Sequence, residues 1–449
     1  MIDGFKNEVM LGAKTELPID FDFSDEFQEA FELLEHSRKH IFVTGNAGTG
    51  KSTLLEYFRM NTRKNIVVLA PTGVAAIKAR GQTIHSFFRF PPRFILENHI
   101  KRLNKDDLFS RIDAVVIDEA SMVRADVLDA IDYSLRLNRN EYNEPFGGTR
   151  IILFGDLFQL PPVVNKEFRD ILRQKYESPY FFSAKIFDQI ELRTINLSKI
   201  YRQKDEKFIA LLNKVRDKTC TDDDLFVLNK RIDRNLADSP KDIVTLTATN
   251  SAAGKLNNHC LAQIEQEEFI YSAGIEGEFN ENEFPAEKDI TLKIGAQVIM
   301  IKNDPKKQWV NGTICNIVEL SDGLIRVRVG HKICDVPKMT WAKIRYSYNE
   351  KKGIIEEETT GSFRQYPLKL AWAITIHKSQ GQTFSNVVID MGKGAFTHGQ
   401  TYVALSRCTD LEGIRLKKPI TESDIIFDKK IYRFMNKISS TNEVQVIDF

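Results

Sequence analysis

The sequence lacks an excess of charge, a close pair of cysteines and a long apolar run. Its 63 Lys and Arg residues almost balance 62 Asp and Glu residues, so bulk charge does not mark a nucleic-acid binder, and any strand-binding surface has to be a local groove. The five cysteines show no C-x-x-C spacing, which argues against a zinc site and fits thiols kept reduced inside a cell. No segment has the apolar length of a membrane span or the apolar core of a signal peptide, which favours an intracellular protein.

The chain is long enough for two or three domains, with 449 residues of which 42% are hydrophobic. Short β-branched runs predict buried parallel strands at residues 41–44, 66–70, 114–117 and 150–154. Helical patterns lie between these runs, which predicts a first α/β lobe over residues 23–190. Further apolar runs at residues 243–248, 387–389 and 402–405 predict a second α/β lobe, made of residues 191–290 and 366–449.

Three other segments differ from this pattern. Residues 291–365 contain short runs separated by Gly and Asp, with strict alternation at 325–329, and predict a small antiparallel β-barrel inserted in the second lobe. Residues 1–22 show no period and are expected to form an N-terminal arm. Residues 88–110 contain two adjacent prolines and several basic residues, and are interpreted as an excursion from the first lobe.

A phosphate-binding loop with the pattern G-x-x-x-x-G-K-S occupies residues 45–52, directly after a predicted strand and before a predicted helix. Backbone N–H groups of such a loop can wrap phosphates, and the start of the helix adds positive potential. Lys51 is expected to reach the β- and γ-phosphates, and Ser52 to bind Mg²⁺. A chance glycine-rich turn is the alternative. The loop residues expected to bind the nucleotide are Gly48, Thr49, Gly50, Lys51, Ser52 and Thr53.

Two more loops follow predicted strands at the same edge of the sheet. Asp118 is expected to hold Mg²⁺ together with Ser52, and Glu119 to polarise the attacking water. Gln159 can hydrogen-bond the γ-phosphate or the water and so report hydrolysis. Solvated acids at a strand end, and a plain polar loop residue, are the alternative interpretations.

These motifs predict a Mg²⁺-dependent nucleoside triphosphatase, but kinases and switch GTPases also contain a phosphate loop. The distinguishing feature is whether a second lobe supplies cations to the same nucleotide. Arg202, in I-Y-R-Q, and Arg407, in A-L-S-R-C, are the candidates. Judged singly, each is more often a surface arginine.

The motifs form part of an ordered series of short stretches, at residues 45–52, 70–76, 83–88, 118–122, 155–162, 201–203, 310–313, 377–383 and 399–407. Together they resemble the Pif (petite integration frequency) DNA helicases, relatives of RecD in helicase superfamily one. The similarity runs from Ser24 to about Lys418. The region from Ser121 to Phe154 looks like the signature that sets this family apart from RecD.

The resemblance implies an α/β fold of two RecA-like P-loop lobes, with the small antiparallel β-barrel inserted in the second. It implies that Arg202 and Arg407 meet the nucleotide across the lobes. It also places Gln28 at the position that reads adenine and Gly381 where the second lobe approaches the nucleotide. The roles given above are kept for Lys51, Ser52, Asp118, Glu119 and Gln159.

Translocation on a single strand needs phosphate contacts without sequence readout and surfaces on which bases stack. Turns between strands and helices, and polar clusters near them, provide the candidates Pro71, Thr72, Gly73, His85, Phe87, Thr249, Asn250, Asn311, Thr375, His377, Lys378 and Ser379. A helix with a core phenylalanine is the alternative for His85 and Phe87, and a solvated turn for residues 377–379. After the Asn-Gly pair at 311–312 the family usually has a second glycine, where this chain has Cys315.

Two basic clusters are expected to line the groove or the duplex junction, unless they only form solvated faces. They are Lys101, Arg102 and Lys105, and Lys302, Lys306 and Lys307. The excursion at residues 88–110 is the candidate for the wedge that separates base pairs.

The resemblance implies an ATP-dependent, 5′-to-3′ DNA helicase that uses ATP and Mg²⁺. It implies activity on single-stranded and forked DNA, RNA–DNA hybrids and G-quadruplexes, by a monomer that can dimerise on DNA, in the cytoplasm with the nucleoid if the chain is bacterial. ATP binding would close the lobes and hydrolysis would reopen them. A RecD-like or transfer-type motor, a non-motor nucleotide switch and a binding module with a decayed ATPase are the alternatives.

Overall fold

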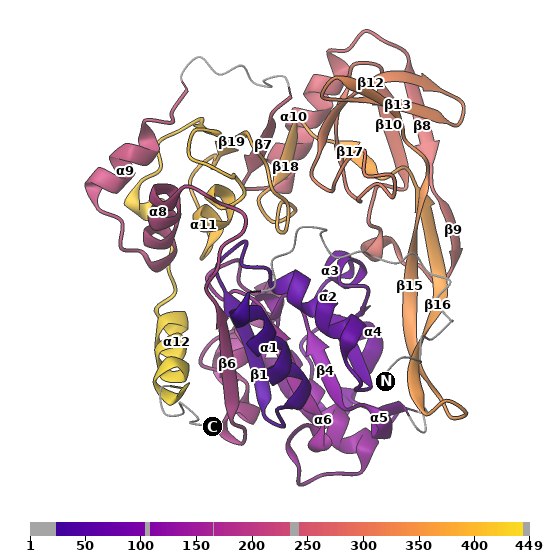
Figure 1. Ribbon diagram of the computed structural model, residues 1–449, viewed down its shortest axis with the longest axis vertical. Coiled ribbons are helices and arrows are strands. Elements are labelled where there is room, and N and C mark those ends of the chain that lie inside the picture. The colour runs from indigo at the N-terminus through magenta and orange to yellow at the C-terminus, as the bar shows by residue number, and fades with distance from the viewer. Residues whose placement is uncertain (1–23, 104–107, 165, 234–241, 443–449) are drawn as a thin grey trace, which may run out of the picture.

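The computed structural model describes residues 24–103, 108–164, 166–233 and 242–442 (Figure 1). The expected N-terminal arm at residues 1–22 lies outside the described residues, as does Lys105 of the basic candidates. The chain forms two α/β lobes, one above the other in Figure 1, and a group of antiparallel sheets beside the upper lobe.

The first lobe is built on a six-stranded sheet of order β3-β2-β4-β5-β1-β6, in which all neighbouring strands are parallel. The strands are β1 (His40–Gly45), β2 (Ile66–Ala70), β3 (Gln82–Thr83), β4 (Ala114–Ile117), β5 (Arg150–Phe154) and β6 (Leu192–Leu197). The expected strands at residues 41–44, 66–70, 114–117 and 150–154 are therefore confirmed. Because β6 pairs with β1, this sheet continues to Leu197, past the expected end of the lobe at residue 190.

Helices cover both faces of this sheet, because successive strand residues point to opposite sides. Val43 packs on one face with Phe58 of α2, and Phe42 packs on the other face in the cluster that contains Leu128 of α6. The α-helices of the lobe are α1 (Asp25–His36), α2 (Lys51–Asn61), α3 (Gly73–Lys78), α4 (Ile84–Phe88), α5 (Leu108–Arg111), α6 (Ala125–Arg139) and α7 (Lys166–Lys175). Its 3-10 turns are η1 (Glu97–His99), η2 (Ala120–Met122), η3 (Pro145–Gly148), η4 (Phe181–Ser183) and η5 (Lys185–Asp188).

The second lobe has a four-stranded parallel sheet of order β18-β7-β19-β20. Its strands are β7 (Val244–Thr247), β18 (Ala373–Thr375), β19 (Val387–Asp390) and β20 (Ile414–Leu416). The helices around it are α8 (Glu206–Asp217), α9 (Asp222–Asn229), α10 (Asn250–Ala262), α11 (Gln400–Leu405) and η7 (Glu422–Asp424), and α12 (Lys429–Asn442) descends beside β6 of the first lobe (Figure 1). The apolar run at residues 402–405 is buried and forms part of helix α11.

The inserted region consists of antiparallel sheets. Their orders are β10-β8, β14-β13-β12-β11-β17 and β15-β16-β9. The strands are β8 (Glu268–Ser272), β9 (Gly274–Gly277), β10 (Asp289–Lys293), β11 (Gln297–Met300), β12 (Ile314–Ser321), β13 (Leu324–Val329), β14 (Lys332–Asp335), β15 (Met339–Asn349), β16 (Ile354–Gln365) and β17 (Leu368–Leu370), with the turn η6 (Glu281–Glu283). Among the described strands the five-stranded sheet is open, so a closed barrel is not confirmed. The pairing of β8 with β10 starts the antiparallel region well before the expected residue 291.

The long hairpin of β15 and β16 reaches down to the first lobe, as Figure 1 shows. The Tyr346 hydroxyl accepts a hydrogen bond from the Val68 N–H at 3.0 Å and donates one to the Val68 carbonyl at 3.3 Å. Arg59 and Glu357 form an ion pair in the same region. The inserted sheets are thus attached to the first lobe as well as to the second.

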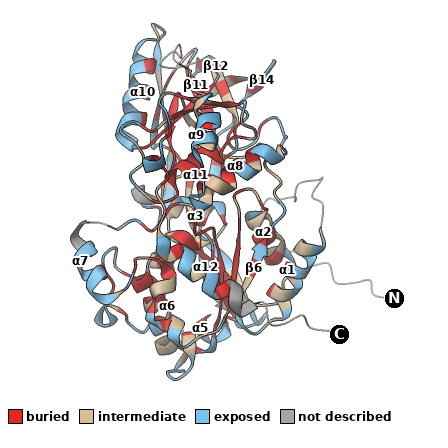
Figure 2. Cartoon of the chain, turned by 90° about the vertical axis from the view of Figure 1, so that its left-hand side faces the viewer, coloured by how far each residue is buried: buried red, intermediate tan, exposed pale blue. Residues whose placement is uncertain are grey.

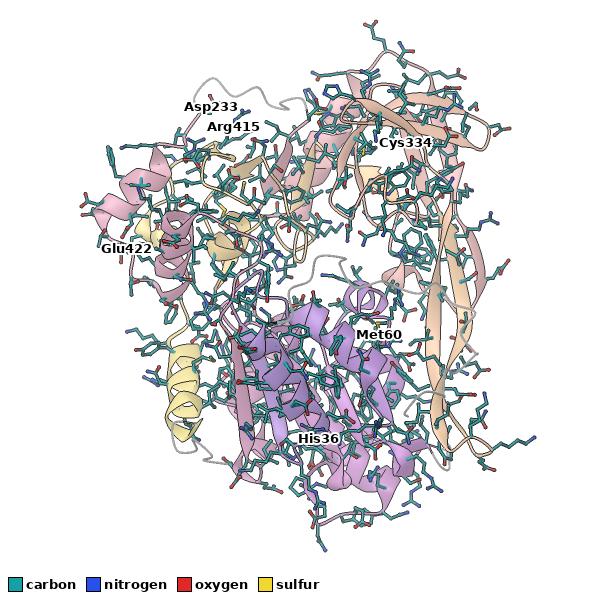
Figure 3. All side chains as sticks on the ribbon, in the orientation of Figure 1. His36, Met60, Asp233, Cys334, Arg415 and Glu422 are labelled. Atoms are coloured by element: carbon teal, nitrogen blue, oxygen red, sulfur yellow. The ribbon has the colours of Figure 1, made fainter. Side chains whose placement is uncertain are left out.

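The buried residues gather along the sheets of both lobes, whereas α7 and α10 are largely exposed (Figure 2). Figure 3 marks Cys334 in the inserted sheets, Asp233 and Arg415 in the second lobe, and His36 in the first. All five cysteines are free thiols. In the part of the chain that the structure describes, no helix combines the length and apolar character needed to cross a membrane.

Candidate active site between the two lobes

The phosphate-binding loop joins β1 to α2 at the edge of the first lobe that faces the second. Gly50, with a φ of 85°, caps the start of α2, and Lys51 and Ser52 occupy its first turn. Gly48 has a φ of 87°, and a Cβ placed on it would lie 2.6 Å from the Cβ of Arg202. The loop is therefore packed so closely against the chain after β6 that only glycine fits at position 48.

The Lys51 ammonium is directed into this loop. Its Nζ donates hydrogen bonds to the carbonyl oxygens of Gly45 and Asn46, both at 2.8 Å. Burial lowers the pKa of Lys51, and the charges of Asp156 and Glu119 act in the opposite direction. A buried cation at the start of a helix, beside two carboxylates, suits the binding of an anionic ligand with a divalent cation.

Asp118 and Glu119 follow β4 at the same edge of the sheet. The pKa of Asp118 is raised by burial and by the charge of Glu119, while Lys78 and Lys51 act against this shift. Glu119 has a left-handed backbone, with a φ of 51°, and its N–H donates to Asp118 Oδ1 at 2.9 Å. Carboxylate and hydroxyl oxygens are the donors that Mg²⁺ prefers, so Asp118 and Ser52 fit that ion.

Gln159 lies in the loop after β5, and its orientation depends on Asp156. Gln159 Nε2 donates to Asp156 Oδ2 at 3.1 Å, and the Phe158 N–H donates to Asp156 Oδ1 at 3.1 Å. The Asp156 residue is only 1% exposed. Sequence reasoning missed this role of Asp156, although the residue belongs to the motif at 155–162.

Arg202 and Arg407 come together beside the phosphate-binding loop. Arg407 is 1% exposed, and its Nε donates to the Val403 carbonyl at 3.0 Å. Burial, followed by the nearby charge of Arg202, lowers the pKa of Arg407 to about 9. Arg202 donates to the Ser406 carbonyl at 3.2 Å, while the preceding Tyr201 N–H donates to the Gly48 carbonyl at 2.9 Å.

Arg407 comes from the second lobe, after α11, as expected. Arg202 differs from the expectation, because it follows β6 and so extends from the sheet of the first lobe. It reaches the phosphate loop through its own lobe and contacts the second lobe at Ser406. It therefore lies at the junction of the two lobes rather than entirely on the second.

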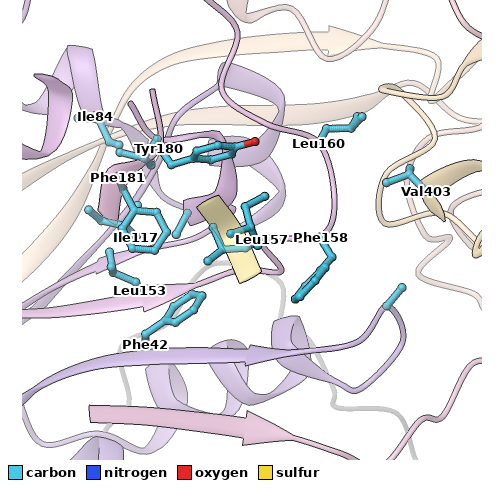
Figure 4. Close-up of a cluster of buried hydrophobic side chains, with 14 of the residues drawn as sticks. Phe42, Ile84, Ile117, Leu153, Leu157, Phe158, Leu160, Tyr180, Phe181 and Val403 are labelled. Atoms are coloured by element: carbon cyan, nitrogen blue, oxygen red, sulfur yellow. The ribbon is translucent and has the colours of Figure 1, made fainter. Parts of the chain in front are cut away.

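Tyr402 links the lobes directly, and sequence reasoning did not single it out. Its buried hydroxyl accepts a hydrogen bond from the Ala47 N–H of the phosphate-binding loop at 3.0 Å. Figure 4 shows the adjacent Val403 in the same apolar cluster as Phe158 and Leu160 of the first lobe. The only sequence signal was the position of Tyr402 inside the motif at residues 399–407.

Gln28 and Gly381 are the other two residues expected to contact the nucleotide. Gln28 is exposed on α1, and its side-chain amide donates to Glu32 at 3.1 Å. A Cβ placed on Gly381, whose φ is 73°, would lie 2.0 Å from Nζ of Lys78 in the first lobe. Gly381 thus faces the side of the cleft that holds Lys78, whose charge also acts on Asp118.

This arrangement of a phosphate loop, two acids, a glutamine and two junction arginines agrees with the comparisons with known proteins. The sequence pattern of the PIF1-like helicase family matches residues 23–225. The ATP-dependent DNA helicase Pif1 of Bdellovibrio bacteriovorus is 33% identical over 429 residues, which cover 92% of each chain.

The chain belongs to the PIF1-like helicase family. It is accordingly an ATP-hydrolysing helicase, and the RecD-like alternative is set aside. The structure of Bacteroides sp. Pif1 in complex with ADP-AlF4 has 37% identity and a TM-score of 0.86, covering 94% of this chain and 98% of that one. Bacteroides Pif1 bound to single-stranded DNA has the same identity and coverage but a TM-score of 0.69.

In this PIF1-like helicase, the candidate DNA contacts of each lobe lie where a strand leads into a helix. Thr72 caps α3 after β2, its Oγ1 accepting from the Ala75 N–H at 3.2 Å. Thr249 caps α10 after β7 in the same way, with the Ala252 N–H at 3.2 Å, and Asn250 beside it is exposed. The two turns therefore have the same local geometry, with a threonine capping a helix directly after a strand.

The helicase's first-lobe turn is partly covered by the inserted sheets. Pro71 is half-buried, and a Cβ placed on Gly73 would lie 3.0 Å from the Cα of Glu283 in η6. His85 is half-buried, and burial lowers its pKa. Phe87 is 0% exposed and packs in the core, so the expectation that its ring is available to a base is corrected here.

The second-lobe cluster of the helicase divides into accessible and buried side chains. His377 is half-buried and Lys378 is exposed. Thr375 and Ser379 are buried, and Ser379 Oγ donates to the Ile376 carbonyl at 2.8 Å, so their side chains do not offer the expected strand contacts. Asn311 is half-buried, and its N–H donates to Asn303 Oδ1 at 2.7 Å.

The described part of residues 88–110, the candidate wedge, is packed more firmly than is expected of an excursion from the first lobe. Phe90, Phe94, Ile95 and Ile100 within residues 88–110 are all buried. Arg102 donates to the Leu137 carbonyl at 3.1 Å, which holds that cluster against α6. The other basic candidates vary in exposure: Lys101, Lys306 and Lys307 are exposed and Lys302 is half-buried.

Proposed function

We propose that this PIF1-like helicase is a DNA helicase that moves 5′-to-3′ on a single strand and unwinds forked duplexes. The observation that supports it best is the gathering of Lys51, Arg202 and Arg407 around one phosphate-binding loop between two lobes. A non-motor switch would not need an arginine from a second lobe in this position. The polarity rests on the family resemblance.

We propose that ATP binds with its phosphates in the loop of residues 45–52. Loop N–H groups and Lys51 would hold the phosphates, and Ser52 and Asp118 would hold Mg²⁺, which supplies charge neutralisation when bound. Glu119 would orient the attacking water, and the Gln159 amide would reach the γ-phosphate. Gln28 and Gly381 would contact the rest of the nucleotide.

Coupling to movement would depend on the two arginines. Arg407 and Arg202 would gain the γ-phosphate as the lobes close, because one buried and one half-buried guanidinium lie beside the loop. Each lobe would grip the strand at its own turn, near Thr72 and Gly73 in the first and near Thr249 and Asn250 in the second. Closure would then shift one grip past the other.

We propose single-stranded and forked DNA as substrates, with RNA–DNA hybrids and G-quadruplexes as further ones. Bacteroides Pif1 has been solved with single-stranded DNA and, as two coordinating helicases, at forked duplex DNA. By analogy this chain would act as a monomer that dimerises on a fork. His377, Lys378 and Asn311 would add contacts to the strand.

We also propose the division expected from the sequence: a first lobe at residues 23–190, a second at 191–290 and 366–449, and a small barrel at 291–365. The strand pairings favour moving two of these limits. The first lobe would end after β6, and the inserted region would begin at β8.

The decisive experiment is a polarity assay on duplexes with a 5′ or a 3′ single-stranded tail. We expect unwinding only from the 5′ tail, and hydrolysis of ATP that single strands stimulate. Lys51→Ala is the control, which should abolish hydrolysis and leave strand binding largely intact because the Lys51 ammonium hydrogen-bonds within the phosphate loop. Unwinding from the 3′ tail would refute the polarity, and hydrolysis indifferent to single strands would favour the switch.

A further inference from the structure

Helix α8 contacts two loops of the candidate active site from the second lobe. Asn213 and Arg216 lie one helical turn apart on it and so share a face. Asn213 Oδ1 accepts a hydrogen bond from Asn46 Nδ2 of the phosphate-binding loop at 2.8 Å. Arg216 Nη2 lies 3.7 Å from Asp156 Oδ1 in the loop that carries Gln159. No motif of the sequence includes this helix.

The Arg216 guanidinium is held between an aromatic ring and a carboxylate. Its Cζ lies 3.6 Å from the centroid of the Phe158 ring, a close cation–π contact. The side chain is 14% exposed, and Nη1 also lies 3.4 Å from Asp217 Oδ1. Within the described part of the chain, its buried Nε has no hydrogen-bond partner. A planar cation that stacks and pairs at once is a geometry that lysine does not reproduce.

Asp156 connects this guanidinium to the glutamine. Its side chain is 0% exposed, so its charge needs compensation inside the protein. Oδ1 faces Arg216 and accepts from the Phe158 N–H, whereas Oδ2 accepts from Gln159 Nε2 at 3.1 Å. Loss of Arg216 would remove the cation that faces Oδ1 of this buried carboxylate, and the carboxylate would then reorient. That change would alter the position of the Gln159 amide, which Oδ2 holds.

We propose that Arg216 is a positioning residue for ATP hydrolysis, which orients Gln159 through Asp156 and joins that loop to helix α8 of the second lobe. The proposal rests on the function proposed above for Gln159. It makes α8 the element that contacts both the phosphate loop, through Asn213, and the loop that senses the γ-phosphate, through Arg216. The second lobe thus receives the state of the nucleotide at a place distinct from Arg407.

The test is a double-mutant cycle between Arg216→Gln and Gln159→Ala, measured as kcat and KM for ATP with saturating single-stranded DNA. We expect Arg216→Gln to lower kcat about tenfold or more and to change KM for ATP by less than about twofold, since the proposed role acts through Asp156 and Gln159. In the Gln159→Ala background, Arg216→Gln should lower kcat by less than about twofold further, because both changes disable one unit.

Arg136→Gln is the matched control. Arg136 has a similar side-chain exposure of 15% and a similar ion pair, with Asp132 at 2.8 Å, but it lies on α6 away from the site. It should leave kcat unchanged. Arg216→Lys keeps the charge and serves if Arg216→Gln does not fold; it should give an intermediate kcat because it loses the planar stack on Phe158.

A wild-type kcat in Arg216→Gln, or in Arg216→Lys if only that variant folds, would overturn the proposal. So would a full additional loss in the Gln159→Ala background, which would mean that Arg216 acts independently of Gln159. Because the readout is hydrolysis, failure of the wild-type protein to unwind a 5′-tailed duplex would count against the proposed function alone.

Discussion

The contact between Gly48 and Arg202 allows a sharp prediction for the substitution Gly48→Ala. A Cβ at this position would lie 2.6 Å from the Arg202 Cβ, whereas non-bonded carbon atoms prefer about 3.5–4.0 Å. Either the loop or the chain at Arg202 must therefore move by about 1 Å. The φ of 87° adds roughly 1–2 kcal/mol of backbone strain for alanine.

A displacement of this size affects catalysis more than binding. The loop N–H groups remain in Gly48→Ala, so the KM for ATP should change little. A shift of about 1 Å in Arg202 or in the loop separates the groups that must meet the γ-phosphate, and such a misplacement lowers a rate by about 100-fold. We expect kcat for strand-stimulated ATP hydrolysis to fall by about that factor.

The assay is steady-state ATP hydrolysis with saturating single-stranded DNA, together with the melting temperature. Gly148→Ala is the control, because Gly148 also has a positive φ, 71°, but a Cβ there would meet nothing within 4 Å. It isolates the backbone strain and should leave kcat unchanged. If Gly48→Ala hydrolyses ATP within about twofold of the wild-type rate, the argument from close packing is refuted.

Three other substitutions have defined outcomes. Arg407→Ala should retain nucleotide binding, measured with a fluorescent ATP analogue, but lower kcat by about 10³-fold or more, and normal hydrolysis would contradict its assignment. Tyr402→Phe removes the acceptor of the buried Ala47 N–H, so the lobe junction should lose about 1–3 kcal/mol and the melting temperature should drop; an unchanged value would show that water replaces the hydroxyl. Burial, followed by the charge of Arg150, lowers the pKa of His40 to about 4, from an ordinary 6.5. As the pH falls, His40 therefore takes up a proton in the unfolded chain before it does so in the folded protein. The wild-type melting temperature should then decrease from pH 6.5 towards pH 4 relative to that of His40→Asn, and parallel curves would disprove the argument.

Strands β1, β2, β4 and β5 of the first lobe could be predicted because each is a short, continuous run of residues that a parallel sheet buries on both faces. The run at residues 402–405 could not be assigned to helix or strand from its pattern, because complete burial removes the periodicity that separates the two. The start of the antiparallel region also could not be predicted. It depends on β8 pairing with β10, a contact between two segments that no local sequence pattern indicates.

The residues of the site also fall into those that could be predicted from the sequence and those that could not. Lys51, Asp118 and Glu119 could be located because their chemistry is written in contiguous motifs next to strands. Tyr402 and Arg216 could not, because their roles arise from packing of one lobe on the other. The burial that removed Phe87, Thr375 and Ser379 from the strand-binding candidates is likewise a property of the folded core.

The hairpin of β15 and β16 has a consequence for how force passes through the molecule. The Tyr346 hydroxyl bonds both the backbone N–H and the backbone carbonyl of one residue, Val68, two residues before the end of β2. Strand β2 leads directly into the turn at Thr72. The inserted sheets are therefore fastened to β2 close to the grip proposed at Thr72, and tension on a strand bound there would pass in part through Tyr346 into a region more than 250 residues further along the chain.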